Sequence, residues 1–410
     1  MKLYKREKYL GKIRGFYSDT SLIKVITGVR RCGKSCLMQT IANELCELGI
    51  PEANIIYLNL DKRGYKNIKS PMQLEAAIDS LCNSIKGVKY LFIDEIQNVL
   101  GFEEIINSFR EEEDYSIFIT GSNSYLLSGE LITKLTGRYI EFEMFPLTFD
   151  EYIGMKRFLG CKLDNNITAE FDSYITEGGF PQTLIYKNIN DKQTYVQSII
   201  KEIFEKDIRR RVKIRDTASF NQIQKYVINN FGATMSFGNI LEDLHKSGSS
   251  IKRETLSRYL QILIDAKILY KCERFDLKSR KSISSGQKYY LADLSFYFAT
   301  NTDNRVNYEP VLENIAFIYA LSKDYSVSVG RIGKLECDFI LRDEQSQYSY
   351  IQVAMTIQNG CETEDREYAP LEMIKDNYPK YVITRNDFIQ RRNGIIHVNI
   401  PEFMQSSKNF

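Results

Sequence analysis

The chain has 410 residues, and at about 150 residues per domain this length predicts two or three domains. Its 55 basic and 53 acidic residues leave a net charge of +2, which excludes attraction of the whole chain to a polyanion, so any nucleic-acid contact must come from a local basic patch. With 43% hydrophobic and 26% charged residues, the composition is that of a globular protein with sizeable cores. No apolar run reaches the roughly 18 residues of a membrane helix, and the first residues lack the apolar stretch of a secretory signal. We therefore expect a cytoplasmic protein that makes no membrane contact.

The cysteines and histidines argue against several kinds of site. The eight cysteines form no Cys-x-x-Cys pair, so neither a zinc ribbon nor a thioredoxin-like site is predicted. Only two histidines are present, His245 and His397, which disfavours a histidine metal cage or a Ser–His–Asp triad.

The first 150 residues alternate between strand and helix patterns. Short apolar and β-branched runs predict five strands, and apolar residues spaced three to four apart predict the helices between them. The expected strands are 24–27, 54–60, 90–93, 116–120 and 139–145, and the expected helices are 35–48, 72–84 and 102–112. This alternation predicts an α/β fold with a parallel sheet covered by helices on both faces.

A glycine-rich segment, 28–35, matches the phosphate-binding pattern G-x-x-x-x-G-K-S between the first strand and the first helix. Its glycines let the backbone N–H groups point at a β-phosphate, Lys34 reaches the β- and γ-phosphate oxygens, and the Ser35 hydroxyl ligates Mg²⁺. The N-terminus of the following helix favours the same negative charge. The expected ligand is ATP, held by Gly28, Val29, Arg30, Arg31, Cys32, Gly33, Lys34, Ser35 and Cys36.

The strand at 90–93 ends in two acidic residues, Asp94 and Glu95. We expect Asp94 to hold Mg²⁺ through water and Glu95 to orient or polarise the attacking water. A solvated acidic pair at a strand end is the alternative. Because a protein that only binds nucleotide as a switch does not need Glu95, its presence favours ATP hydrolysis.

Two further positions are candidates for catalysis. Ser122 or Asn123, after the fourth strand, would lie at the carboxyl edge of the sheet, where either could sense the γ-phosphate or hold water. A turn and helix cap is the alternative role of these residues. Arg138 precedes the fifth strand and could stabilise transition-state charge in its own or a neighbouring subunit, although an ordinary surface arginine fits equally well.

Five segments, 28–35, 90–97, 120–128, 135–138 and 145–152, together resemble the AAA-type P-loop ATPases of bacteria and archaea. The resemblance also covers 177–181 and the start of a basic run at 204–208, and so spans nearly the whole chain. In that family the ATPase domain is followed by a winged-helix and restriction-endonuclease-like region of unknown function. The resemblance therefore implies an ATPase whose client is not identified.

The pattern after the ATPase motifs predicts three further regions. We expect the ATPase domain at 1–147, a helical linker or lid at 148–218, a winged-helix-like domain at 219–295 and a PD-(D/E)XK-like domain at 296–410. The turn at 178–181 would allow a hinge. The basic run 206–215 would either track phosphates or form a solvated helix face or an inter-subunit contact.

The winged-helix outline consists of helices at 220–230, 236–246 and 253–265 and of hairpin strands at 268–275 and 287–291. In a DNA-binding protein, its third helix and the hairpin turn would contact the duplex. Protein binding is the alternative. The candidate cations are Lys252, Arg253, Arg258, Lys278, Arg280 and Lys281.

The last region resembles a PD-(D/E)XK nuclease core, but it departs from the nuclease pattern at two positions. Glu313, Asp338 and the segment 352–354 stand where such a core places its metal-binding acids and its lysine. Gln352 brings no charge, however, and Ala354 replaces the lysine, for which Lys375 is a speculative substitute. We therefore expect a nuclease-like fold without nuclease activity.

These patterns leave three hypotheses for the whole chain. The first is an enzyme that hydrolyses ATP with Mg²⁺ and couples this to rearrangement of its C-terminal domains on a DNA or protein client, with a homo-oligomer as one arrangement. The second is an ATP-gated DNA-binding module. The third is a metal-dependent nuclease.

Overall fold

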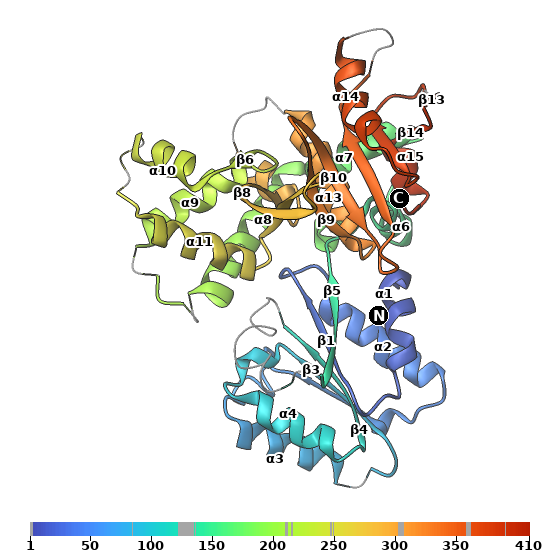
Figure 1. Ribbon diagram of the computed structural model, residues 1–410. Helices are drawn as coiled ribbons and strands as arrows, with labels where there is room; N and C mark the ends of the chain where they lie inside the picture. The colour runs from blue at the N-terminus through green and yellow to red at the C-terminus, as the bar shows by residue number, and fades with distance from the viewer. Residues whose placement is uncertain are drawn as a thin grey trace. The chain divides into compact units, whose positions relative to one another are not determined.

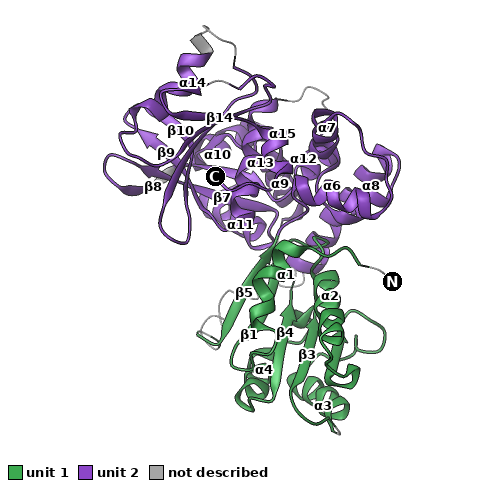
Figure 2. Cartoon of the chain, turned by 90° about the vertical axis from the view of Figure 1, so that its right-hand side faces the viewer, with its two compact units in different colours: residues 1–144 green, residues 145–410 purple. Residues whose placement is uncertain are grey.

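The computed structural model describes residues 3–83, 85–121, 135, 137–209, 212–214, 216–246, 248, 250–301, 307–357, 362–389 and 391–410. The chain divides into two compact units, residues 1–144 and residues 145–410 (Figure 2). Within the described ranges, every helix is too short or too polar to cross a membrane.

The first unit contains a five-stranded parallel sheet in the order β2-β3-β4-β1-β5, which confirms the predicted α/β class (Figure 1). Its strands are β1 Ile23–Gly28, β2 Ile55–Asn59, β3 Lys89–Asp94, β4 Tyr115–Thr120 and β5 Tyr139–Met144. Its helices include α1 Glu7–Ile13, α2 Lys34–Glu47, α3 Pro71–Cys82 and α4 Phe102–Glu111.

The central strands β1, β3 and β4 are buried on both faces of the sheet because they carry apolar side chains in both directions. One face packs against α3 and α4 through residues such as Leu91, Ile93 and Ile106. On the other face the rings of Phe92 and Phe118 stack with centroids 4.6 Å apart. Such doubly buried strands are expected in a parallel sheet whose connections are helices.

The strand order determines which strand ends meet. β4 lies between β1 and β3, so the end of the acidic strand does not adjoin the end of β1 directly. In the pairing register, Asn59 lies opposite Asp94, and Gly28 lies opposite Met144. From the end of β1 the chain crosses to β2, which lies on the β4 side of β1, whereas β5 lies on the opposite side of β1. Ligands bind at such a switch point, outside the carboxyl ends of the strands.

The second unit begins with a group of helices, and a second group of three helices and a β-hairpin follows it. The first part comprises α6 Phe149–Phe158, α7 Ile167–Glu177, α8 Ile189–Glu202 and the π-helical segment η6 Ile203–Ile208. The second comprises α9 Thr217–Asn229, α10 Phe237–Lys246, α11 Arg253–Asp265 and the antiparallel hairpin β7 Leu269–Asp276 and β8 Lys281–Leu291.

A mixed nine-stranded sheet runs through the rest of the second unit in the order β13-β14-β12-β11-β10-β9-β7-β8-β6. β7 pairs in parallel with β9, so the hairpin continues the C-terminal sheet. The remaining elements are β6 Thr234–Met235, α12 Ser295–Thr300, α13 Tyr308–Ser322, β9 Ser326–Ile332, β10 Leu335–Arg342, β11 Tyr348–Val353, α14 Glu362–Met373, β12 Lys380–Thr384, β13 Arg391–Arg392, β14 Ile395–Asn399 and α15 Ile400–Gln405.

The turn at 178–181 makes a close backbone contact. Leu147 N–H donates to the carbonyl of Gly179 at 2.7 Å, and Gly179 N–H donates to the buried carboxylate of Asp293 at 2.6 Å. A Cβ atom on Gly179 would lie 2.3 Å from the Leu147 carbonyl oxygen. Glycine is therefore required here for close approach of two segments.

Candidate functional site

The segment from Gly28 to Ser35 forms a tight loop between β1 and α2. Gly28 has φ +135°, and a Cβ atom there would lie 2.1 Å from the carbonyl oxygen of Met144, so the loop begins against the end of β5. Gly33 has φ +113°. The buried Lys34 ammonium donates to the carbonyls of Gly28 at 2.9 Å and Val29 at 3.1 Å, which holds it inside the loop.

Asp94 is fixed at the end of β3 by donors from both neighbouring strands. The residue is 1% exposed. Asn59 Nδ2, at the end of β2, donates to Asp94 Oδ2 at 2.7 Å, and Thr120 Oγ1, at the end of β4, donates to Oδ1 at 2.6 Å. Donors on both oxygens fix the orientation of the carboxylate.

Glu95 adopts an unusual backbone conformation beside the loop. Its φ is +59°, in the left-handed region that costs a non-glycine residue about 1–2 kcal/mol. Its N–H donates to Thr120 Oγ1 at 3.1 Å, and its carboxylate accepts from Gln97. The Arg30 guanidinium lies 3.8 Å from Glu95 Oε2. The glycine-rich loop and the acidic strand end, predicted separately, therefore meet in space.

The oxygen donors at this edge suit Mg²⁺. Ser35 is half-buried in the first turn of α2 and supplies a hydroxyl, and Asp94 supplies a carboxylate. The described residues contain no group of three or more histidine, cysteine, aspartate or glutamate side chains that would form a metal cage. Mg²⁺ commonly binds through one or two protein oxygens together with substrate phosphates and water, so this donor set fits the ion.

The other predicted loop residues differ in exposure. Val29 and Cys32 are buried, whereas Arg31 and Cys36 are exposed. These positions contribute mainly backbone groups to the loop. Arg6, which precedes α1, donates to the carbonyl of Cys32 at 3.1 Å and so fixes the loop from outside.

Arg138 lies near the amino ends of the strands β1 and β5, whereas the loop lies at their carboxyl ends. Ile23 N–H, at the start of β1, donates to the Arg138 carbonyl at 2.9 Å, whereas the loop follows the end of β1. The six residues of β5 span roughly 20 Å at 3.3 Å per residue. The Arg138 side chain is 44% exposed and donates to Asn107 Oδ1 at 3.2 Å. A role of Arg138 in its own subunit's site is therefore not supported.

Ser122 and Asn123 lie outside the described residues. Asn59, Thr120 and Arg6 were not assigned roles from the sequence. Asn59 and Thr120 each end an apolar strand with a polar side chain, and that position at the carboxyl edge was the available signal. Nothing in the sequence around Arg6 indicates a contact with Cys32.

The predicted acids of the C-terminal region do come together. Lys288 Nζ, on β8, lies 3.0 Å from Glu313 Oε2 and 4.0 Å from Asp338 Oδ1. Gln352 Oε1 accepts from the backbone N–H of Asp338 at 3.4 Å. Lys375 is exposed beyond the end of α14, and the cation in this cluster is instead Lys288.

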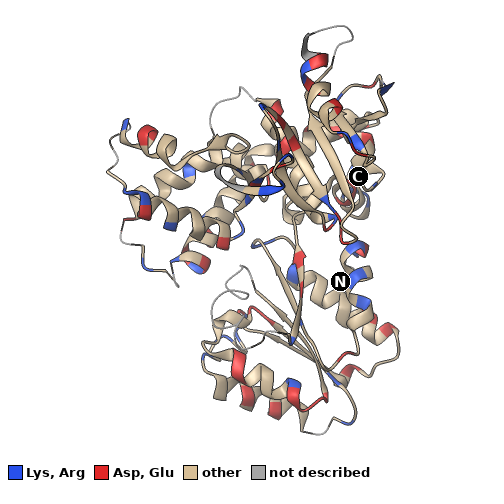
Figure 3. Ribbon diagram, in the orientation of Figure 1, with Lys and Arg blue, Asp and Glu red and all other residues tan. Residues whose placement is uncertain are grey.

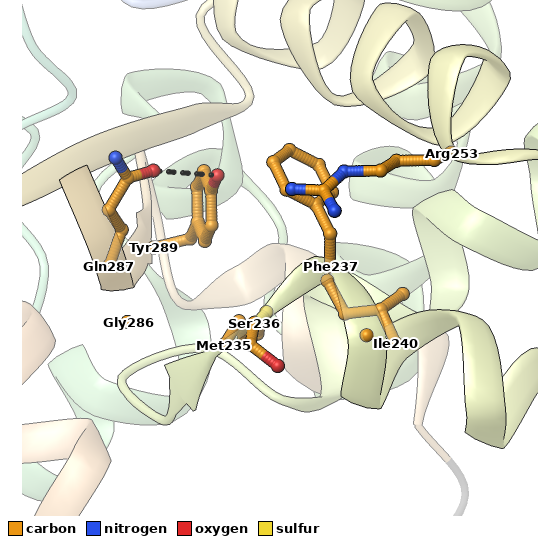
Figure 4. A pocket seen from close by; sticks show the side chains of 9 residues that line it. Met235, Ser236, Phe237, Ile240, Arg253, Gly286, Gln287 and Tyr289 are labelled. Atoms are coloured by element: carbon orange, nitrogen blue, oxygen red, sulfur yellow. Dashed lines mark hydrogen bonds between the residues drawn. The ribbon is translucent and has the colours of Figure 1, made fainter.

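The candidate nucleic-acid-binding cations are all exposed. Lys252 immediately precedes α11, Arg253 and Arg258 lie on α11, and Lys278, Arg280 and Lys281 lie at the turn of the β7–β8 hairpin. Figure 3 shows the lysine and arginine positions of the chain in blue. Figure 4 shows Arg253 beside a cavity of about 260 Å³, lined also by Gln287 and Tyr289. The Arg253 guanidinium lies 5.5 Å from the centre of the Phe237 ring, so stacking positions it at the start of α11.

Two family models match this chain. One, described as an AAA domain, matches residues 20–153, and the other, a domain of unknown function (DUF8612), matches residues 168–305. The chain is 35% identical over 402 residues to an uncharacterized protein of Haemophilus influenzae, covering 97% of this chain and 98% of that protein. An uncharacterized protein of Methanocaldococcus jannaschii is 30% identical over 377 residues, covering 89% and 82% of the two chains.

Among solved structures, the chain resembles a Walker-type ATPase of Pyrococcus abyssi with a TM-score of 0.51 and 15% identity. The likeness covers 73% of this chain and 96% of that chain. At this identity it concerns the fold, and it agrees with the parallel sheet and the glycine-rich loop described above.

Proposed function

The chain belongs to the family of AAA-domain proteins that includes the Haemophilus and Methanocaldococcus relatives, and we propose that it binds ATP with Mg²⁺ and hydrolyses the nucleotide to ADP and phosphate. The observation that carries the proposal is the meeting of the Arg30 loop with Glu95, beside an Asp94 carboxylate held by donors on both oxygens. Nucleotide binding alone would not require a second acid at this position.

Each residue then has a distinct role. Lys34 is held within reach of the β- and γ-phosphate oxygens, and the loop N–H groups surround the β-phosphate. Ser35 and Asp94 would hold Mg²⁺, which when bound would neutralise charge on the phosphate oxygens. Glu95 orients the attacking water and accepts its proton. Its contacts with Arg30 and Gln97 position the carboxylate at the same edge.

Arg30 lies beside Glu95 in the loop of its own site, whereas Arg138 would have to act in a second copy of the chain. Because Arg138 lies at the far edge of its own sheet, we propose that it acts on a neighbouring subunit's site in a homo-oligomer. Ser122 and Asn123 stay candidates for contact with the γ-phosphate or the water, since they follow Gly121 at the end of β4 in the sequence.

Turnover is coupled to the second unit through the chain that follows β5. Gly28 abuts the Met144 carbonyl, so a rearrangement of the loop bears on the end of β5. Three residues later, Leu147 bonds to Gly179, which in turn bonds to Asp293 after the hairpin. We propose that this path transmits nucleotide state to the C-terminal regions, which act on a protein or DNA client.

Two substitutions test the ATPase assignment. Lys34→Ala should abolish ATP binding, because the ammonium within the loop is lost. Glu95→Gln should bind ATP and release phosphate slowly, because magnesium coordination survives while water activation is lost. Thermal protection by ATP and Mg²⁺ measures binding, and a phosphate-release assay measures turnover.

The matched controls are the exposed Lys66→Ala and Glu112→Gln in the same unit, which should behave like wild type. Thermal protection that persists unchanged in Lys34→Ala contradicts the loop assignment. If Glu95→Gln neither binds nor turns over ATP, Glu95 is structural.

A second candidate function is ATP-gated DNA binding by a winged-helix-like module formed by α9–α11 and the hairpin. The exposed cations of α11 and the hairpin turn favour it. Arg253→Ala together with Arg258→Ala should weaken DNA binding and reduce its salt dependence, whereas Lys66→Ala should change neither. Absent or salt-independent binding, with and without ATP, rejects this function and leaves a protein client.

A further inference from the structure

A buried ionic cluster in the second unit joins the hairpin to the C-terminal sheet. Lys288 Nζ, on β8, lies 3.0 Å from Glu313 Oε2 on α13 and 3.1 Å from Glu336 Oε1 on β10. Asp338 Oδ1, also on β10, is 4.0 Å from the same nitrogen. The side chains of Lys288, Glu313 and Asp338 are each 10% exposed or less. Three acidic side chains from two elements thus surround the Lys288 ammonium group.

We propose that the Lys288 ammonium, and not a divalent cation, neutralises Glu313, Glu336 and Asp338, which as placed form no metal-binding group among the described residues. The cluster then acts as a permanent internal clamp between the hairpin and the C-terminal sheet. The inference does not depend on ATP hydrolysis, since every residue in it lies in the second unit.

The cluster already contains cations for its acids. Lys288 and Arg274 supply two cations, and Arg274 pairs with the second oxygen of Glu336. Glu313, Glu336 and Asp338 supply the acidic side chains around Lys288. A divalent cation beside the Lys288 ammonium would add positive charge to a buried site that already holds one, which is costly.

Hydrogen bonds also engage Asp338 and its neighbours Gln352 and Glu367. Asp338 Oδ2 accepts from Val353 N–H at 2.8 Å. Gln352 uses its amide oxygen on the Asp338 N–H and donates from its amide nitrogen to Glu367 at 3.0 Å. Glu367 also accepts from Arg366. Gln352 thus links two acids by hydrogen bonds where a carboxylate would have ligated a metal.

The same contacts hold the hairpin in place. Tyr290 OH donates to Glu313 Oε2 at 2.9 Å, and Asn314 forms two hydrogen bonds with the backbone of Leu291, at 2.7 and 3.0 Å. Two successive residues of α13 therefore bind three residues of β8. Removing the Lys288 charge would leave the buried acids Glu313 and Asp338 without their cationic partner, which is the circumstance in which a buried ion pair is most costly to break.

The experiment titrates Mn²⁺ into the full-length protein without nucleotide, by calorimetry, alongside thermal unfolding. Wild type should bind no Mn²⁺ at this cluster, so Asp338→Asn should leave its Mn²⁺ binding unchanged. Lys288→Met should unfold at lower temperature, bind one additional Mn²⁺ per chain and regain stability in its presence. Lys288→Arg, which keeps a cation, should gain no site. Lys271→Met, at a more exposed lysine on β7, should resemble wild type in both measurements.

Two double variants keep the test decisive if Lys288→Met does not fold. Lys288→Met with Glu313→Gln removes one charge of each sign, and should be more stable than the sum of the two single losses predicts. Lys288→Met with Asp338→Asn should lack the additional Mn²⁺ site. The proposal is overturned if wild type binds Mn²⁺ in a way that Asp338→Asn removes, if a folded Lys288→Met gains no site, or if the Lys288 and Glu313 effects are additive.

Discussion

The hydroxyl of Thr120 donates to Asp94 Oδ1 at 2.6 Å and accepts from the backbone N–H of Glu95 at 3.1 Å. This single buried side chain therefore fixes both acids of the proposed ATPase site. It orients the carboxylate of Asp94 and supports the left-handed backbone of Glu95. Groups that orient metal-binding carboxylates in this way commonly matter nearly as much as the ligands themselves.

Thr120→Val should lower ATP turnover roughly 10- to 100-fold, because valine keeps the volume of threonine but offers neither donor nor acceptor. ATP binding should weaken less, since Lys34 and the loop amides stay in place. Phosphate release and ATP-dependent thermal protection separate the two effects. The control is Thr183→Val, at another buried threonine whose hydroxyl bonds to the Phe180 carbonyl in the second unit. Wild-type turnover in Thr120→Val would show that Thr120 does not position these acids.

The sequence predicts the strands of the first unit because their signals are local. Apolar runs define β1 to β5, and the glycine-rich pattern and the acidic pair occupy contiguous residues. Each predicted strand lies within one or two residues of an observed one. The parallel sheet also places the ends of β1 and β3 at one edge, so their meeting follows from the topology.

Long-range pairings explain what the sequence does not predict. Asn59 reaches Asp94 because β2 pairs with β3 in a particular register. The sequence of either strand alone does not determine that register. Lys288 reaches Glu313 because the hairpin joins the C-terminal sheet through the parallel pairing of β7 and β9. Periodicity predicts the elements but not which edges meet, so the cation of the C-terminal cluster could not be identified in advance.

The stability of the first unit should depend on Glu44 at neutral pH. Arg14 donates to both carboxylate oxygens of Glu44, at 2.8 and 3.0 Å, and Tyr17 OH donates at 2.9 Å. The hydrogen bonds from Arg14, with help from Tyr17 and Lys5, lower the pKa of Glu44 to about 2. Because the folded pKa lies below the unfolded one, the contribution is complete above about pH 4.5 and is lost as pH falls toward 2.

Glu44→Gln should therefore lower the free energy of unfolding at pH 7 by about 1–3 kcal/mol, since it loses charge-assisted hydrogen bonds from partly exposed partners. The measurement is urea unfolding of the full-length protein, in which the transition that ATP shifts is assigned to the first unit. The gap between wild type and variant should narrow between pH 5 and pH 3. Glu47→Gln, at an exposed neighbour on the same helix, should leave stability nearly unchanged. A gap that is constant with pH would contradict this role of the Glu44 charge.

Lys24 should give the first unit a second pH dependence, of the same sign as that of Glu44 but in the alkaline range. Its buried ammonium donates to the carbonyls of Asp19 and Leu22 and to Ser116 Oγ, and burial lowers its pKa to about 7. Between pH 7 and 10.5 the unfolded chain binds more protons at this position, so stability rises with pH by up to about 1.4 kcal/mol per unit. Lys24→Met should lose this slope, and the difference between the two profiles over pH 7.5–9.5 isolates it. Lys66→Met should keep the wild-type slope, and parallel profiles for Lys24→Met and wild type would refute the prediction.

The purified protein should not cleave linear or supercoiled DNA with Mg²⁺ or Mn²⁺. Metal-dependent cleavage requires converging carboxylates that bind the metal, together with a cation that assists the developing charge. Here the Asp338 carboxylate accepts from Val353 N–H, Gln352 supplies an amide bonded to Glu367, and Ala354 supplies no donor at the position of the usual lysine. The cation that is present, Lys288, is buried among the acids. Incubation of plasmid with wild type and with Asp338→Asn and Glu313→Gln should give the same uncut product. If wild type cuts the plasmid and both variants do not, the C-terminal sheet carries an active nuclease and the assignment of Gln352 and Ala354 is wrong.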